Sequence, residues 1–268
     1  MHSITRLTIH TDKEKDWIVK QDREEITSIF SGKVSSNYEI IAEPDRAMEI
    51  AVLETSRSLE LLRYSIWAVH PNGAQRIDVG LMSDTLKGRR NAIALSETQF
   101  LSRWKRTTLP LRIEPSTMHK LRNAGVFKLS NIMKKSNKTN LETCLLRFLH
   151  WISDSYSQTE MENQLVSLLV GLEAVFGSGN NSVGFGSAMM IGESLSDRKK
   201  IKEKVSVLYK YRNGVVHGSK NNLIVVEDVH YLRNITMKLM INILELIDVQ
   251  QLKSTGDLKE LIQERQLS

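Results

Sequence analysis

The sequence predicts a mainly α-helical protein, with a bundle of four to five helices at residues 116–250 behind a smaller mixed α/β region at residues 1–115. Two observations support this fold class. After Pro115, apolar residues recur every three or four positions over long segments, which is the period of an amphipathic helix. Before Pro115, short apolar runs bounded by turn residues are typical of strands. Residues 251–268 are expected to form a C-terminal tail.

The first region contains one clear helix and up to three strands. The segment "DRAMEIAVLETSRSLELLRYSIWAV", Asp45 to Val69, has apolar residues at helical spacing, and a Pro-Asn-Gly turn follows it. Strands are predicted over 74–82, 91–100 and 107–113, the last at a sheet edge because it contains Pro110. Residues 1–40 support no assignment and are consistent with the tail of a longer parent domain.

Six segments of the helical region are interpreted as helices. The first begins at a cap on Ser116 or Thr117 and stops at Gly125, and the fifth begins at a cap on Ser196 or Asp197. A glycine-rich stretch, Gly177 to Ser187, lacks the Gly-Lys-Ser/Thr ending of a phosphate-binding P-loop, so a flexible loop is expected there. The predicted helices cover residues 116–125, 139–156, 159–177, 188–195, 196–213 and 227–247.

Composition limits the possible classes of protein. Apolar residues make up 41% of the chain and charged residues 25%, which is a globular balance rather than a disordered one. The single cysteine, Cys144, allows no disulfide within the chain and no cysteine-based zinc site, and no window of about 18 uncharged apolar residues exists to span a membrane. The start of the chain has no apolar run of signal-peptide length, so a reduced cytoplasmic setting is expected, without a membrane partner.

The net charge of +6 is compatible with an anionic partner or with solubility alone. Basic residues concentrate in two runs, His119 to Lys138 and Asp197 to Arg212. Each run is interpreted either as a solvated helix face or, if both face the same way, as half of a phosphate-attracting surface. The seven histidines form no ligand pair at metal-binding spacing, so no metal is predicted. The candidate RNA-binding residues are Lys134, Lys135, Lys199, Lys200 and Lys210.

The stretch "YKYRNGVVHG", Tyr209 to Gly218, allows two interpretations. Asn213-Gly214 between apolar residues is typical of a hairpin turn. The capped, helically periodic residues before it favour a helix that carries Arg212 and His217 at its end. On a straight helix these two residues lie roughly 140° apart around the axis and ~7.5 Å apart along it, so they would not converge on one atom. Either Gly214 loosens the helix or a second copy of the chain completes the site.

The same residues resemble a known family. "RNGVVH" fits the signature of HEPN domains, in which an Arg and a polar residue precede a His at a spacing of four to six residues. The segment "LVGLEAVFG", a loop and "IGESLSDRKKIKEKVSVLYKYRNGVVHG" are similar to the Apea-like HEPN group, over about Leu141 to Ile247. Gly214 departs from the family pattern as a helix-weakening residue inside the motif. The fold implied is a helical bundle, in agreement with the helix assignments above.

The resemblance implies a metal-independent RNA endonuclease without a cofactor, in a group that includes effectors of phage defence and toxins. The 2′-OH of the RNA would attack the adjacent phosphorus and leave 2′,3′-cyclic phosphate and 5′-OH ends. His217 would be the general acid or base, Arg212 would bind the phosphate and stabilise the extra charge of the transition state, and Asn213 would orient His217 or the phosphate. Glu173 matches a family glutamate that would hold Arg212 or serve the helix alone. Tyr209 matches a family tyrosine and is expected to pack.

Family members often dimerise through these helices, so a homodimer is expected, with a regulatory protein as a further possible partner. The alternative to the enzyme is an inactive HEPN module that binds RNA, a nucleotide or a protein. A helical oligomerisation domain with an apolar dimer face is a third hypothesis.

Overall fold

The computed structural model describes residues 42–70, 92–95, 100–103, 115–217 and 224–267. These residues form nine helices and one two-stranded sheet, which confirms the predicted mainly helical fold class. The helices are α2 (Pro44–Val69), α4 (Pro115–Asn123), α5 (Val126–Lys134), α6 (Asn140–Ser157), α7 (Met161–Phe176), α8 (Asn180–Ile191), α9 (Leu195–Val216), α10 (Val226–Gln250) and α11 (Thr255–Leu267).

The chain divides into two compact units, Met1–Ser58 and Leu59–Ser268. The described part of the first unit is the beginning of α2, where Arg46 pairs with Glu49 and Arg57 with Glu54 at exposed positions. The second unit contains the end of α2 and all the later elements.

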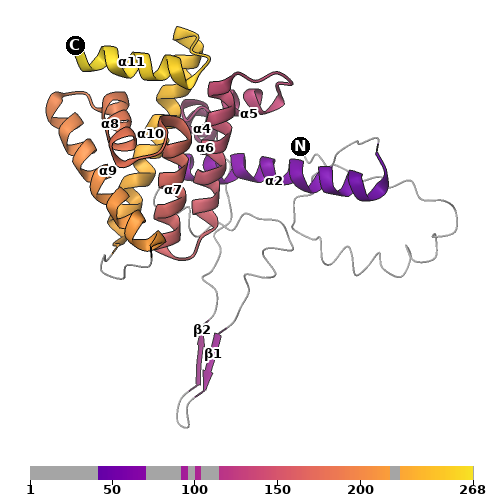
Figure 1. Cartoon of the computed structure of the whole chain (residues 1–268). Coiled ribbons are helices and arrows are strands. Elements are labelled where there is room, and N and C mark those ends of the chain that lie inside the picture. The colour runs from indigo at the N-terminus through magenta and orange to yellow at the C-terminus, as the bar shows by residue number, and fades with distance from the viewer. Residues whose placement is uncertain (1–41, 71–91, 96–99, 104–114, 218–223, 268) are drawn as a thin grey trace. The chain divides into compact units, whose positions relative to one another are not determined.

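Helix α7 lies at the centre of the bundle. It packs against α6, α8, α9 and α10, and Figure 1 shows it between α6 and the α8–α9 pair. Its apolar side chains are completely buried on several sides of the helix, as the broad apolar stripe of the sequence predicts. Each buried leucine stabilises the fold by roughly 1.5–3 kcal/mol. The four leucines of α7 belong to one apolar cluster with Phe148 and Ile152 of α6, Leu208 of α9 and Leu239 of α10; these leucines are Leu165, Leu168, Leu169 and Leu172.

The starts of two helices are set by residue types that can be recognised in the sequence. Helix α6 has a capping box, in which the Thr139 side chain accepts from the Glu142 N–H at 3.2 Å and Glu142 Oε2 accepts from the Thr139 N–H at 2.8 Å. Helix α4 starts at Pro115, one residue before the expected cap at Ser116, because proline suits the first position of a helix. Gly125 ends this segment with φ +75°, as its position in the sequence predicted, and α5 follows it directly.

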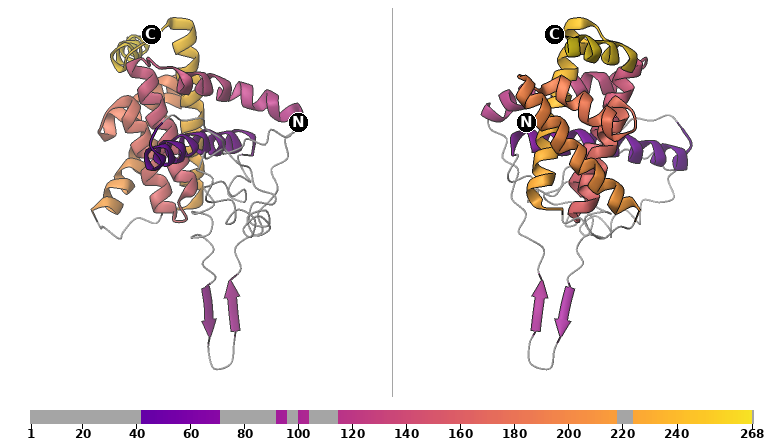
Figure 2. Two further views of the ribbon diagram at one scale, coloured as in Figure 1. Left: turned by 90° about the vertical axis from the view of Figure 1, so that its right-hand side faces the viewer. Right: turned by 60° about the vertical axis from the view of Figure 1, so that its left-hand side comes forward.

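The predicted glycine-rich loop is wrong over most of its length, because α8 begins at Asn180. A Cβ on Gly184 would lie 2.8 Å from Oγ of Ser206 on α9, and a Cβ on Gly186 would lie 2.5 Å from Cδ1 of Phe176 on α7. The bare glycine backbone therefore lets α8 approach both neighbours closely. This packing outweighs the low intrinsic helix propensity of glycine. Figure 2 shows the bundle from two further sides.

The short helix predicted over 188–195 is also wrong, because these residues belong to two different helices. Ala188 to Ile191 form the last turn of α8, and Leu195 is the first residue of α9. The cap of α9 is Ser194, whose Oγ accepts from the Asp197 N–H at 3.1 Å, rather than Ser196 or Asp197.

The sheet consists of two antiparallel strands, β1 (Ala92–Leu95) and β2 (Phe100–Arg103), paired from Ala92 with Arg103 to Leu95 with Phe100. The strand predicted over 91–100 contains β1, but its last residue belongs to β2. The strands predicted over 74–82 and 107–113 lie outside the described residues.

The segment expected as a C-terminal tail forms α11, which packs against the bundle. Leu258 and Ile262 of this helix are buried, and the Arg198 guanidinium donates to the Arg265 carbonyl oxygen at 3.1 Å. No helix in the described part of the chain is long and apolar enough to cross a membrane.

Candidate functional site

The motif stretch lies at the end of α9 that is remote from α11 (Figure 1). Helix α9 continues through Asn213 and Gly214 to Val216, so the helical interpretation of this stretch is confirmed and the hairpin turn is wrong. Gly214 does not interrupt the helix.

Arg212 is held by two neighbours. Its Nη2 donates to Oε2 of Glu173 on α7 at 3.3 Å, and its Nη1 donates to Oδ1 of Asn213 at 3.1 Å. The Arg212 side chain is 21% exposed and the Glu173 side chain 16% exposed, so the ion pair is partly shielded from water while part of the arginine side chain remains in solvent. Nε of Arg212 is buried and has no hydrogen-bond partner among the described residues.

Tyr209 joins the same group through its hydroxyl. The hydroxyl donates to Oε1 of Glu173 and accepts from the N–H of Gly179, at the start of α8, at 3.1 Å. The guanidinium carbon of Arg212 lies 5.5 Å from the centre of the Tyr209 ring. Burial, together with the hydrogen bond to the Glu173 carboxylate, raises the pKa of Tyr209 above its usual value. The expectation that Tyr209 only packs is therefore incomplete.

These contacts define what we call the Arg212 network: Glu173, Gly179, Tyr209, Arg212 and Asn213. Both carboxylate oxygens of Glu173 are engaged, one by a hydroxyl and the other by a guanidinium. The tyrosine could have been associated with the arginine from the sequence, because residues three positions apart share a face of a helix. No sequence signal pointed to the backbone of Gly179.

His217 lies apart from this network. It is the C-terminal cap residue of α9, and its backbone N–H donates to the Asn213 carbonyl oxygen at 3.0 Å. Its side chain is exposed and forms no hydrogen bond or ion pair with another described residue. Within the described part of one chain, the His217 imidazole is therefore not bonded to the Arg212 guanidinium.

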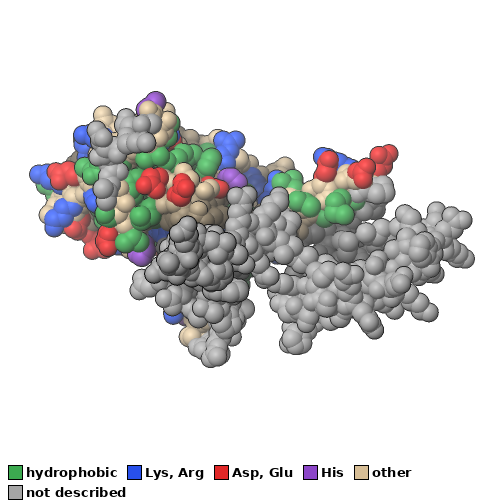
Figure 3. Space-filling view, turned by 90° about the horizontal axis from the view of Figure 1, so that it is seen from below, with side chains coloured by type: hydrophobic (Ala, Val, Ile, Leu, Met, Phe, Trp, Pro, Cys, Tyr) green, Lys and Arg blue, Asp and Glu red, His purple; other side chains and the backbone are tan. Residues whose placement is uncertain are grey.

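The five candidate RNA-binding lysines are divided between two helices. Lys134 and Lys135 are exposed at the end of α5, where Lys135 pairs with the buried Glu142 at 2.5 Å. The other three, Lys199, Lys200 and Lys210, are exposed on α9. Helix α5 packs on α4 and α6 whereas α9 packs on α7 and α8, and Figure 1 shows α5 and α9 on opposite sides of the bundle. Figure 3 shows basic and acidic side chains interspersed on the described surface seen from below.

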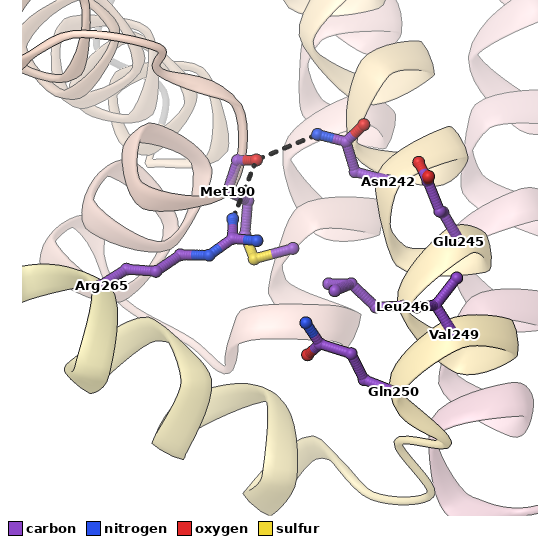
Figure 4. Close-up of a pocket in the computed structure, with 7 residues that line it drawn as sticks. All are labelled: Met190, Asn242, Glu245, Leu246, Val249, Gln250 and Arg265. Atoms are coloured by element: carbon purple, nitrogen blue, oxygen red, sulfur yellow. Dashed lines mark hydrogen bonds between the residues drawn. The ribbon is translucent and has the colours of Figure 1, made fainter.

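A pocket of about 310 Å³ lies between α8, α10 and α11, away from the motif. The Asn242 side chain and the Arg265 guanidinium both donate to the Met190 carbonyl oxygen, at 3.0 and 3.5 Å (Figure 4). Leu246 and Val249 supply apolar walls, and Glu245 and Gln250 are polar. This pocket was not predictable from the sequence, because its residues come from three helices.

No group of three or more His, Cys, Asp or Glu residues that could hold a metal ion occurs among the described residues. Comparison with protein-family models, with curated proteins and with solved structures found no match.

Proposed function

We propose that this chain is a metal-independent endoribonuclease of HEPN type. The observation that carries the proposal is the Arg212 network, in which a partly exposed guanidinium is fixed by a carboxylate one helix away. A guanidinium held in this way has N–H groups left over, because Nη1 and Nη2 each carry two hydrogens and each has one protein acceptor. These remaining donors suit two oxygens of a phosphodiester, which arginine binds through charge-assisted hydrogen bonds.

The proposed reaction needs a base and an acid. The 2′-OH oxygen attacks the adjacent phosphorus and loses its proton to a base, the O2′–P bond forms, and the P–O5′ bond breaks as an acid protonates O5′. Imidazole suits both roles because histidine titrates near neutral pH. Arg212 would stabilise the additional negative charge on phosphorus in the transition state.

His217 and Arg212 of one chain are not bonded to each other, so the proposal includes a second copy of the chain. In a homodimer, the exposed His217 of one copy would serve as base and that of the other as acid, with the two Arg212 side chains at the phosphate. The exposure of His217 at the end of α9 supports this arrangement, because the side chain is accessible to a partner chain and to RNA.

The test is cleavage of single-stranded RNA in EDTA by the purified protein, with analysis of the product ends. We expect 2′,3′-cyclic phosphate and 5′-OH ends, and a loss of about 10²-fold or more in rate for Arg212→Ala and for His217→Ala. His150→Ala is the matched control, because His150 is an exposed histidine on α6, outside the motif and outside both basic runs. Undiminished cleavage by both motif variants would contradict the proposal.

The second candidate is an inactive module of the same fold that binds RNA. The separation of His217 from the Arg212 network within one chain favours it, because an arginine site alone binds phosphate without transferring protons. This candidate predicts binding that weakens steeply with salt and yields no cleavage products.

A further inference from the structure

The hydroxyl of Tyr209 occupies a position that packing alone does not require. The residue is 6% exposed, and its ring lies in the apolar core of the bundle. Its hydroxyl nevertheless joins two elements that are not on its own helix, the backbone of Gly179 and the carboxylate of Glu173. A phenylalanine would fill the same space without either bond.

The two bonds fix the place where α7 ends and α8 begins. Glu173 lies in the last turn of α7, which ends at Phe176, and Gly179 is the residue before α8. Gly177 and Gly179 both have positive φ, +84° and +112°, a backbone conformation open mainly to glycine. The segment between the helices contains only residues 177–179, so the Gly179–Tyr209–Glu173 chain of bonds spans the whole turn.

The orientation of Arg212 depends on the same carboxylate. Oε2 of Glu173 accepts from Arg212 while Oε1 accepts from Tyr209, so rotation of the carboxylate would disturb both bonds. The Arg212–Glu173 bond is long at 3.3 Å, and a weak bond benefits most when its acceptor is held in place from the other side.

We propose that Tyr209 is a positioning residue for Arg212, because its hydroxyl orients the Glu173 carboxylate that holds the guanidinium. This role rests on the proposed function, since the readout is cleavage of RNA. It assigns to Tyr209 a part in the reaction without contact with the substrate, and it makes the α7–α8 turn part of the phosphate-binding arrangement.

The test compares Tyr209→Phe with the matched control Tyr211→Phe. Tyr211 is half-buried on the same helix, and its hydroxyl forms no hydrogen bond with a described residue. We expect Tyr209→Phe to lower kcat on single-stranded RNA in EDTA by roughly tenfold or more, which is the size expected for loss of a hydrogen bond to a charged group. Tyr211→Phe is expected to leave kcat within about twofold of the unchanged protein.

A double-mutant cycle separates positioning from a structural role. If Tyr209 acts through the guanidinium, Tyr209→Phe costs much less in an Arg212→Lys background than in the unchanged protein, because lysine lacks the planar fork that Glu173 orients. An effect of packing alone would be the same in both backgrounds. Glu173→Gln provides a second variant, and it is expected to lower kcat about as much as Tyr209→Phe does. In the double variant that carries both changes, the loss in kcat is expected to be smaller than the two single losses combined.

The outcomes distinguish the two proposals. Cleavage by the unchanged protein together with equal cleavage by Tyr209→Phe overturns the positioning role and leaves the proposed function standing. Equal losses for Tyr209→Phe in both Arg212 backgrounds also overturn it. Absence of cleavage by the unchanged protein overturns the proposed function, and the positioning role falls with it.

Discussion

Replacement of Gly186 by alanine sets two opposing effects of known size against each other. Alanine is favoured over glycine inside a helix by ~0.8–1 kcal/mol, so a glycine-to-alanine change at an open helical position stabilises a protein. Here, the new Cβ would lie 2.5, 2.8 and 3.0 Å from three ring atoms of Phe176. That ring is 5% exposed and belongs to the packed core, so it has little room to move.

Overpacking of a core costs ~1–3 kcal/mol, and contact with three atoms of a confined ring places Gly186→Ala in the upper part of that range. We therefore expect a net loss of about 1–2 kcal/mol in the free energy of unfolding. For a unit of this size, the midpoint of thermal unfolding would fall by roughly 2–8 °C.

The measurement is urea unfolding followed by far-UV circular dichroism, with the m-value compared between variants. Ser182→Ala is the control on the same helix, because Ser182 is exposed and the change is expected to alter stability by no more than about 0.5 kcal/mol. A Gly186→Ala protein as stable as the original, or more stable, would refute the explanation given for α8.

Two further changes test charged groups in the bundle. Burial alone would raise the pKa of Glu142, but hydrogen bonds from Lys135 and Thr139 outweigh burial and lower the pKa below its usual value. Because its pKa is lower in the folded state, the Glu142 carboxylate stabilises the fold at pH values above its pKa in the unfolded chain, which is about 4.3. This contribution is lost as the pH falls through the pKa of Glu142 in the folded state. Glu142→Gln keeps a capping side chain but removes the charge, so loss of the charged hydrogen bonds should lower the free energy of unfolding by about 1 kcal/mol at neutral pH. The loss should be smaller near pH 3 in the same urea assay, and a loss independent of pH would contradict this reasoning. Arg233 is 7% exposed, its Nη2 donates to Oε1 of Gln164 at 2.7 Å, and its guanidinium carbon lies 4.4 Å from the centre of the Trp67 ring. Among the described residues, its Nε has no hydrogen-bond partner and its guanidinium pairs with no carboxylate. Burial lowers the pKa of Arg233 to about 10, which shows that the charge of Arg233 is unfavourable in the core. Arg233→Met should therefore leave the free energy of unfolding unchanged or raise it by up to ~2 kcal/mol, whereas Gln164→Leu should lower it. The reverse order in the same assay would show that the cation stabilises the core.

Much of the fold was predictable because helical periodicity and capping are local. The apolar stripe of residues 159–177 and the capping box at Thr139 identify α7 and the start of α6 without reference to any other part of the chain. Helix α8 was missed for the opposite reason. Five of its first seven residues are Asn, Ser or Gly, so local propensity favours a loop, whereas close packing against α7 and α9 stabilises a helix.

The candidate site divides in the same way. The resemblance selected Glu173, Tyr209, Arg212 and Asn213, and the structure brings these four together with Gly179. The role of the tyrosine hydroxyl was not predictable, because it depends on the path of the turn after α7. The separation of the candidate lysines was not predictable either, because it depends on which neighbouring helices α5 and α9 pack against.

The amino-acid sequence alone predicts the mainly helical class, the positions of most helices and the residue types available for phosphate chemistry, because each of these depends on spacing within one segment. The folded structure was needed to show that Arg212 is bonded to Glu173 of α7, which Tyr209 also contacts, and that His217 lies outside this network. These outcomes depend on how far apart two helices lie and how they are rotated, and those quantities are set by the packing of side chains distant in sequence.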